Sequence, residues 1–308
     1  ATVTYLSILS LFSLGIFVEL KFKFSRIRMF IGLLSFLLGL VQAHAALTDA
    51  PACAASDMSE ASNYLSKFDQ YTLTYFDGRG LAEVSRTLFA TTGRFPQDGG
   101  FTDVRLSQDD FDTMRGKGDL AQNLNRVPVL RHNDAIIGQS STIARYLARK
   151  FNLLGKDEVE AAKIDALCEH IEDIKSAWRK IFPYPGSKNF TKVEKDKGYA
   201  IWFETPPAPK MDGRKERQLQ WFLQQMEQEL DETGYSVGMR PSLSDAYLYN
   251  LLGEQAPELG AKGEGWFLNR LATDRILNMF PKLAAVVRTF GESPGMRHWK
   301  IVRGDQNW

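Results

Sequence analysis

Residues 71–151 carry a closely spaced succession of strand and helix patterns, and this succession most constrains the fold. Residues 71–76 alternate and are rich in β-forming side chains, whereas residues 81–91 place apolar side chains at helical spacing. The order β-α-β followed by β-β-α predicts a small mixed sheet covered by helices. The expected elements are, in chain order, a strand over 71–76, a helix over 81–91, strands over 101–106, 127–130 and 135–137, and a helix that begins near Ser140.

The remainder of the chain is predicted to be helical. Ser242 and Asp245 are spaced as a capping box, which is typical of a helix start. Residues 182–212 are rich in Pro, Lys and aromatic side chains and predict an irregular loop. We therefore expect an α/β domain over 71–151 and an all-α domain over 152–308. The expected helices of the second domain lie over 158–179, over 214–233, after Pro241 and over 281–291.

Composition excludes several classes of protein. The chain has 308 residues, of which 44% are hydrophobic, which is enough for the cores of two domains. A balance of 38 basic and 37 acidic residues argues against a protein built mainly to bind nucleic acid, so we expect no nucleic-acid partner. With only two cysteines, Cys53 and Cys168, the chain cannot form a disulfide scaffold or a multi-cysteine zinc site. Its four histidines lack metal-ligand spacing, and we expect no metal site.

Residues 1–45 differ from the rest of the chain. Residues 1–18 carry no charge, a short basic stretch follows, and a second apolar run ends at Ala45 in a small-x-small pattern. This predicts a signal peptide cleaved after Ala45, and hence a protein of the secretory pathway or the extracellular space. An uncleaved membrane anchor and a segment without a targeting role, in a cytoplasmic protein, are the alternatives. Membrane association is expected only through residues 1–45. Residues 46–70 are interpreted as a linker, and a glycosylation sequon begins at Asn189.

A set of short motifs connects the chain to a known family. The motifs are Tyr-Thr-Leu-Thr-Tyr-Phe-Asp-Gly-Arg-Gly at 71–80, Asn-Arg-Val-Pro-Val-Leu at 125–130, Gly-Gln-Ser-Ser-Thr-Ile-Ala-Arg-Tyr-Leu at 138–147, the capping box at 242–245 and Phe-Pro-Lys-Leu at 280–283. In this order and spacing the chain resembles a cytosolic-type glutathione transferase of the sigma class, which includes haematopoietic prostaglandin D synthase and the S-crystallins. The resemblance implies the glutathione transferase fold, with a thioredoxin-like domain over 71–151 and an all-α C-terminal domain. It also implies a homodimer and glutathione as co-substrate.

The resemblance assigns the catalytic role to Tyr75, at the end of the first strand. Free thiols ionise near pH 8.5, and the thiolate is the nucleophile. A hydroxyl that donates a hydrogen bond to sulfur stabilises the charged form and lowers the thiol pKa. Tyr71 lies on the same strand face and is expected to pack in the core. Leu81 stands where the sigma class commonly has an arginine that supports the catalytic tyrosine, which leaves the activation of Tyr75 open.

The resemblance also implies where glutathione binds. Val127 and Pro128 match the family's cis-proline position, where the backbone pairs with the cysteinyl part of glutathione like an added strand. Gln139 and Ser140 match the site of the γ-glutamyl carboxylate, and free amides at a helix start favour an anion there. The expected glutathione-binding residues are Phe111, Arg115, Arg126, Val127, Pro128, Gln139, Ser140 and Asp173.

One of these assignments departs from the family pattern, and another concerns a contact with the glutathione of a partner subunit. Phe111 and Arg115 lie four residues apart, as a tryptophan and a lysine do at the glycyl end in the sigma class, but phenylalanine lacks the indole donor. Asp173, with Glu172 as the second choice, matches an acid that reaches the partner subunit's glutathione. Cys168 lies on an apolar helix face and is expected to be buried rather than nucleophilic.

These features predict a glutathione transferase that conjugates reduced glutathione to hydrophobic electrophiles. A prostaglandin-type isomerase that uses the same thiolate is a sub-case, because the electrophile pocket is lined by variable side chains. The alternative from another class is a non-catalytic, crystallin-like or ligand-binding protein on the same fold, which Leu81, Phe111 and the long loop predicted over 182–212 favour. The reactive sulfur is expected to arrive with glutathione, which accords with the scarcity of cysteine in the chain.

Overall fold

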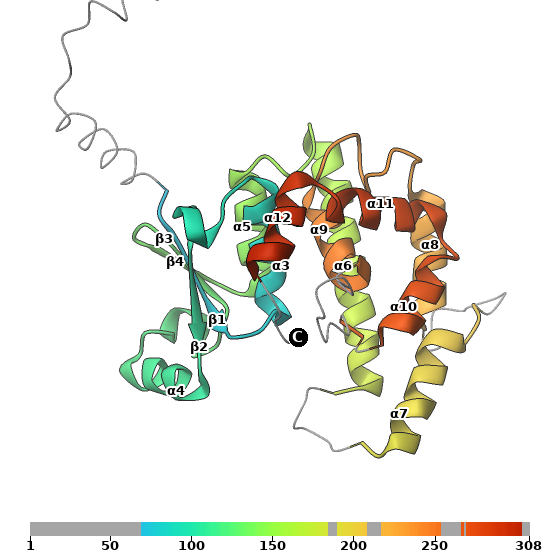
Figure 1. The fold of residues 1–308 in the computed structure, drawn as a ribbon, viewed down its shortest axis with the longest axis horizontal. Helices are drawn as coiled ribbons and strands as arrows, with labels where there is room; N and C mark the ends of the chain where they lie inside the picture. The colour runs from blue at the N-terminus through green and yellow to red at the C-terminus, as the bar shows by residue number, and fades with distance from the viewer. Residues whose placement is uncertain (1–68, 184–189, 208–216, 254–265, 268, 304–308) are drawn as a thin grey trace, which may run out of the picture. The chain divides into compact units, whose positions relative to one another are not determined.

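A computed structural model describes residues 69–183, 190–207, 217–253, 266–267 and 269–303 (Figure 1). The chain divides into two compact units, residues 1–67 and 68–308, and all described residues belong to the second. The predicted signal peptide or anchor, nearly all of the predicted linker, Cys53 and Asn189 lie outside the described residues. In the part that is described, no helix is both long and apolar enough to cross a membrane.

A four-stranded mixed sheet forms the first layer. Its strand order is β2-β1-β3-β4, with β1 parallel to β2 and antiparallel to β3, and β3 antiparallel to β4. The inward side chains of β1 and β3, Leu73 and Leu130, are fully buried. The strands span Tyr71–Phe76 (β1), Thr102–Leu106 (β2), Val129–His132 (β3) and Ala135–Gly138 (β4).

Helix α3 joins the sheet to the helical part of the molecule, since it packs against α5, α9 and α12 (Figure 1). Its side chains from Glu83 to Ala90 are all buried, polar ones included. The helices near the sheet span Glu83–Thr91 (α3), Gln108–Lys117 (α4) and Ser140–Lys150 (α5), with short 3-10 turns at Gly80–Ala82 (η2), Pro96–Asp98 (η3) and Ala121–Asn123 (η4).

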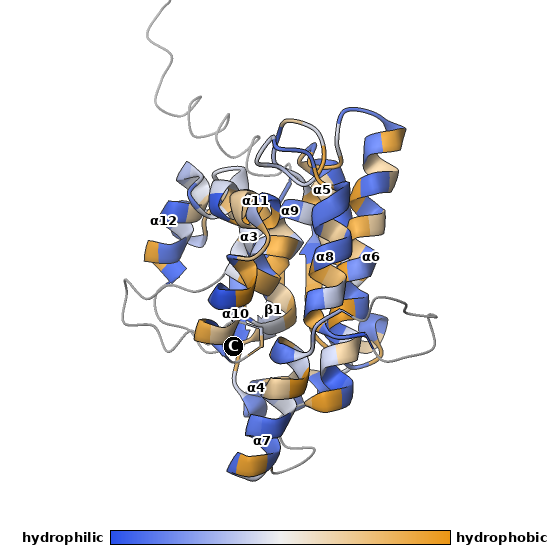
Figure 2. Cartoon of the chain, turned by 90° about the vertical axis from the view of Figure 1, so that its right-hand side faces the viewer, coloured by the Kyte–Doolittle hydropathy of each residue, from blue (hydrophilic) through white to orange (hydrophobic). Residues whose placement is uncertain are grey.

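The second part of the fold is helical. A core of aromatic side chains, among them Trp178, Trp202 and Phe267, lies between its helices. In Figure 2, α8 presents hydrophilic residues to the viewer, while hydrophobic residues gather around α9. The elements span Glu158–Ile181 (α6), Lys192–Tyr199 (α7), Ala200–Glu204 (η5, a π-helix), Leu219–Glu229 (α8), Leu243–Leu248 (α9), Tyr249–Gly253 (η6, a π-helix), Arg270–Leu277 (α10), Pro281–Gly291 (α11) and Pro294–Arg303 (α12).

Two sequence interpretations need correction. The irregular loop predicted over 182–212 is wrong, because α7 and η5 lie within it. Thr191 caps α7 by accepting from the backbone N–H of Glu194, whose carboxylate accepts from the Thr191 N–H in return. Helix α4 was not expected, although Ser107 and Asp110 form the same capping box at its start. Both helices are short and polar, so they lack the apolar periodicity on which the prediction depended.

Candidate active site

The register of the sheet brings three predicted site residues together. At one edge of the sheet, Val129 of β3 pairs with Thr74 of β1 and with Gly138 of β4. Tyr75 directly follows Thr74, Pro128 directly precedes Val129, and Gln139 directly follows Gly138. They therefore lie side by side across three neighbouring strands. The edge is also where the parallel strands β1 and β2 end, so the loops after both strands converge on it. The sheet thus forms one platform for residues that are far apart in the sequence.

The Tyr75 hydroxyl lies against the turn that follows β1. The backbone N–H of Leu81 donates a hydrogen bond to it at 3.3 Å. A Cβ atom at Gly80 would lie 2.6 Å from the same oxygen, and Gly80 has a φ of +42°, so both contact and backbone conformation require glycine there. A phenol that accepts one hydrogen bond can still donate its own proton, which is what activation of a thiol needs.

A buried charge network holds the turn after Tyr75 in place. The Arg86 guanidinium donates to the Gly78 carbonyl at 2.6 Å and to Asp103 on β2 at 3.1 Å. It also pairs with Glu83, which accepts from Arg303 on α12 at 2.9 Å. Burial alone raises the pKa of Glu83, but the charges of Arg303 and Arg86 outweigh burial and lower that pKa to about 2. The network therefore ties the turn to β2, α3 and the last helix.

Tyr71 has the packing role that the sequence predicted. It is 4% exposed, and its ring stacks on His132 at 4.3 Å between centroids. Burial raises the pKa of Tyr71 to about 12. The Tyr71 hydroxyl is therefore enclosed and harder to ionise. Of the two tyrosines on β1, Tyr75 is the better candidate to donate a hydrogen bond to a thiol.

The loop before β3 is fastened by a residue that sequence reasoning missed. The Val127–Pro128 peptide bond is cis. The buried Asn123 side chain donates to the carbonyls of Arg126 and Pro128 at 2.9 and 3.0 Å. Its carbonyl oxygen accepts from the Gln139 backbone N–H at 3.1 Å. In the sequence, only an asparagine five residues before Pro128 pointed to this role. The three hydrogen-bond partners of Asn123 are visible only in the fold.

Helix α5 starts at the same edge of the sheet. Ser140 is its first residue, and Gln139, the N-cap, has a φ of +69° and forms no side-chain capping bond. Amides at the start of a helix carry partial positive charge and favour an anion. The structure therefore places Gln139 and Ser140 at a helix start, with Ser140 half-buried and Gln139 exposed, and their contact with glutathione stays a prediction.

Phe111 and Arg115 lie on α4, which follows β2. The Phe111 ring is 5.0 Å from that of Phe76 at the end of β1, so it borders the platform. The Arg115 guanidinium lies over the Phe111 ring at 5.4 Å and pairs with Asp112 at 2.7 Å. Arg115 and Arg126 are both exposed. Their predicted contacts with glutathione stay predictions.

The two acids on α6 have different surroundings. Asp173 is exposed. Glu172 accepts a hydrogen bond from Lys175 at 2.9 Å. It also lines a small cavity between α6 and the Gly80–Leu81 turn. Asp173 is therefore open to the surface, whereas Glu172 faces a cavity of its own chain.

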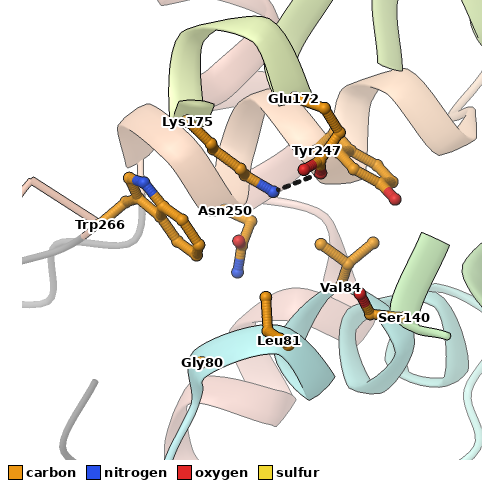
Figure 3. A pocket seen from close by; sticks show the side chains of 9 residues that line it. All are labelled: Gly80, Leu81, Val84, Ser140, Glu172, Lys175, Tyr247, Asn250 and Trp266. Atoms are coloured by element: carbon orange, nitrogen blue, oxygen red, sulfur yellow. Dashed lines mark hydrogen bonds and ion pairs between the residues drawn. The ribbon is translucent and has the colours of Figure 1, made fainter. Parts of the chain in front are cut away.

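This cavity has a volume of about 10 Å³, which is room for one water-sized group. Figure 3 shows α6 and the α9–η6 segment above it and the Gly80–Leu81 turn below it. Lys175 and Asn250 are its buried polar residues, and sequence reasoning missed both. The lining residues are Gly80, Leu81, Val84, Ser140, Glu172, Lys175, Tyr247, Asn250 and Trp266.

Cys168 is 1% exposed, as predicted, and burial raises the pKa of its thiol. A protonated, enclosed thiol is a poor nucleophile. Among the described residues, no group of three or more His, Cys, Asp or Glu side chains is placed to hold a metal ion.

Comparison with known proteins identifies the class of fold. No family model matches the chain. An S-crystallin, SL18 from Nototodarus sloanii, is 38% identical over 114 residues, which are 37% of this chain and 34% of the crystallin. A putative glutathione S-transferase alpha-2 from Dictyostelium discoideum is 28% identical over 225 residues, 73% of this chain and 90% of the relative. The Pi-class glutathione S-transferase of Onchocerca volvulus superposes with a TM-score of 0.54 at 25% identity, covering 76% of this chain and 93% of that one.

The chain therefore has the glutathione transferase fold, a thioredoxin-like sheet domain followed by helices, as the sequence predicted. Its homologues and structural neighbours are glutathione S-transferases and related proteins such as the S-crystallin. The matched segments span 34%, 46% and 50% of the first three curated relatives. Membership of the sigma class stays a prediction.

Proposed function

We propose that this protein is a glutathione transferase, in which Tyr75 stabilises the thiolate of bound glutathione. The observation that carries the proposal is the position of the Tyr75 hydroxyl. It lies beside the Gly80–Leu81 turn, on the platform that Pro128 and Gln139 share. Relatives named glutathione S-transferase support the choice of glutathione as co-substrate.

In this mechanism glutathione binds along the edge of the sheet. Its cysteinyl backbone pairs with Val127 as an added strand, and its γ-glutamyl carboxylate lies at the start of α5 near Ser140. The Tyr75 hydroxyl donates to the sulfur and favours the charged form. The thiolate then attacks an electrophile held on the side of the helical domain, and the thiol proton leaves to solvent.

We further propose that the protein works as a homodimer, in which Asp173 of one subunit faces the glutathione of the other. The exposure of Asp173 supports this, because its neighbour Glu172 is already engaged by Lys175. A glutathione amino group needs an acidic partner, and an exposed carboxylate on α6 supplies one.

The test compares the two strand tyrosines in the full chain. We expect Tyr75→Phe to lower kcat for conjugation of glutathione to 1-chloro-2,4-dinitrobenzene about 100-fold, with glutathione binding retained. Ultraviolet titration of the bound thiolate should show its pKa rising by roughly two. Tyr71→Phe is the matched control and should retain wild-type rates, because Tyr71 packs in the core.

The alternative, a non-catalytic binding protein, has a distinct outcome in the same assay. A wild-type protein that binds glutathione but turns over no electrophile would refute the transferase and leave the binding protein. If Tyr75→Phe and Tyr71→Phe have equal rates, the thiolate mechanism through Tyr75 is refuted even where conjugation occurs.

A further inference from the structure

Helix α12, the last helix that the structure describes, reaches the buried charge network of the candidate site. It packs against α3, and Figure 1 shows the two helices side by side. The contact is close, because a Cβ atom at Gly295 would collide with the carbonyl oxygen of Ala90 on α3. Near the end of α12, Trp299 and Arg303 are 1% and 8% exposed, and both donate to one acid on α3, Glu83.

The Glu83 carboxylate uses its two oxygens in different directions. Oε1 accepts hydrogen bonds from Trp299 Nε1 and Arg303 Nη1, both at 2.9 Å. Oε2 lies 3.4 Å from Arg86 Nη1. Because the pKa of Glu83 is lowered to about 2, the carboxylate is charged at neutral pH and can accept from all three donors at once. Glu83 therefore connects the end of α12 to Arg86.

Arg86 carries this connection to the catalytic tyrosine. Its Nη1 atom also donates to the Gly78 carbonyl at 2.6 Å, and its Nε atom donates to Asp103 on β2 at 3.1 Å. Three residues after Gly78, the N–H of Leu81 donates to the Tyr75 hydroxyl at 3.3 Å. A displacement of the Arg86 guanidinium would therefore move the backbone turn that fixes the Tyr75 hydroxyl.

Attachment of α12 to the fold does not by itself require buried charges. The Met296 side chain of α12 is fully buried, and the His298 ring contacts that of Phe95 at 4.5 Å between centroids. Charges are costly to desolvate, and replacement of a buried ion pair by well-packed apolar residues is often neutral or stabilising. A charged contact between α12 and α3 accordingly indicates that the position of the joined groups matters, beyond the attachment of the helix.

We propose that Trp299 and Arg303 are positioning residues for Tyr75. They act through Glu83 and Arg86, which together hold the turn that fixes the Tyr75 hydroxyl. This inference rests on the proposed transferase function. In this role neither residue of α12 contacts glutathione or the electrophile. Their effect on catalysis must therefore pass through Tyr75 and appear in the ionisation of the bound thiol.

The test follows this ionisation in the full chain. We measure kcat/KM for 1-chloro-2,4-dinitrobenzene at saturating glutathione as a function of pH, which reports the thiol pKa in the complex with glutathione. Arg303→Met should raise this pKa by about one, so that kcat/KM falls about 10-fold at pH values below the pKa and returns to the wild-type value above it. Trp299→Phe, which removes one N–H and no charge, should cause about a threefold fall at low pH.

Three further variants isolate the route through Tyr75. Arg303→Lys keeps the charge and should recover most of the rate at low pH. Arg297→Met, an exposed change on the same helix, should keep the wild-type pH profile. In a Tyr75→Phe background, Arg303→Met should cause no further rise in the thiol pKa, because the group through which it acts is already removed. Thermal unfolding shows which variants are folded at the assay temperature. If Arg303→Met is not, the pH profile of Trp299→Phe decides alone.

The outcomes separate this proposal from the transferase function. If the wild type conjugates glutathione and both α12 variants keep its pH profile, the proposal is refuted and the transferase stands. A rate loss that is equal at all pH values shows a purely structural role, and it also refutes the proposal. A further rise of the thiol pKa in the Tyr75→Phe background shows that the charge of Arg303 acts directly on the sulfur, which refutes a positioning role. If the wild type conjugates no electrophile, the transferase is refuted and this proposal with it.

Discussion

Asn123 offers a quantitative test of how the candidate site is assembled. Its side chain makes three hydrogen bonds, to the carbonyls of Arg126 and Pro128 and from the N–H of Gln139. These partners belong to two separate loops, and both loops carry predicted glutathione contacts. The asparagine is 5% exposed, so water does not readily replace it. Asn123→Leu removes all three bonds at nearly constant volume.

The magnitude follows from the number of bonds. Each intramolecular hydrogen bond contributes about 1 kcal/mol net, so three contribute roughly 3 kcal/mol to the free energy of unfolding. For a folded unit of the size of residues 68–308 we expect Tm to fall by about 6–12 °C. Displacement of the loops should also raise KM for glutathione about 10-fold, because small errors in position are costly in binding and catalysis.

The assays are thermal unfolding and conjugation kinetics with glutathione as the varied substrate. Gln122→Leu is the matched control, since Gln122 is the exposed neighbour on the same 3-10 turn. The reasoning is refuted if Asn123→Leu and Gln122→Leu have the same Tm and the same KM. A fall in Tm without a change in KM would show that Asn123 stabilises the fold without positioning the glutathione loops.

The sequence predicted those parts of the fold that local patterns determine. The helix over 281–291 was predicted with the bounds it has, because Pro281 begins it and an apolar stripe runs along it. Ser242 and Asp245 form the capping box that their spacing indicated. Helix α7 was missed although Thr191 and Glu194 have the same spacing, because it has few apolar residues to reveal a buried face.

The chemistry of the cavity could not be predicted in this way. Lys175 and Asn250 lie on two helices that are distant in sequence, and each alone is compatible with a solvent-facing position. Only the packing of α6 against α9 encloses them together. Tyr75 could be named as a candidate because it is a local feature at a strand end, whereas the bonds of Arg86 to Gly78, in the turn after Tyr75, and to Asp103 on β2 appear only in the fold.

Two further predictions concern charged residues. Asp173→Asn should raise KM for glutathione about 10-fold in a protein that light scattering shows to be dimeric, whereas Glu158→Gln, an exposed change on the same helix, should not; equal KM values would contradict the contact between subunits. Glu83 has a pKa lowered from 4.5 to about 2, so its carboxylate stabilises the fold above pH 4.5 and this contribution is lost as the pH falls toward 2. The shift corresponds to about 3 kcal/mol. We expect Glu83→Gln to lower the free energy of urea-induced unfolding by about that amount at pH 7, because it leaves Arg86 and Arg303 buried without their shared acid. The difference from wild type should shrink between pH 4.5 and pH 2, as wild-type Glu83 itself becomes protonated. A difference that stays constant down to pH 2 would mean that Glu83 contributes through packing rather than through its charge.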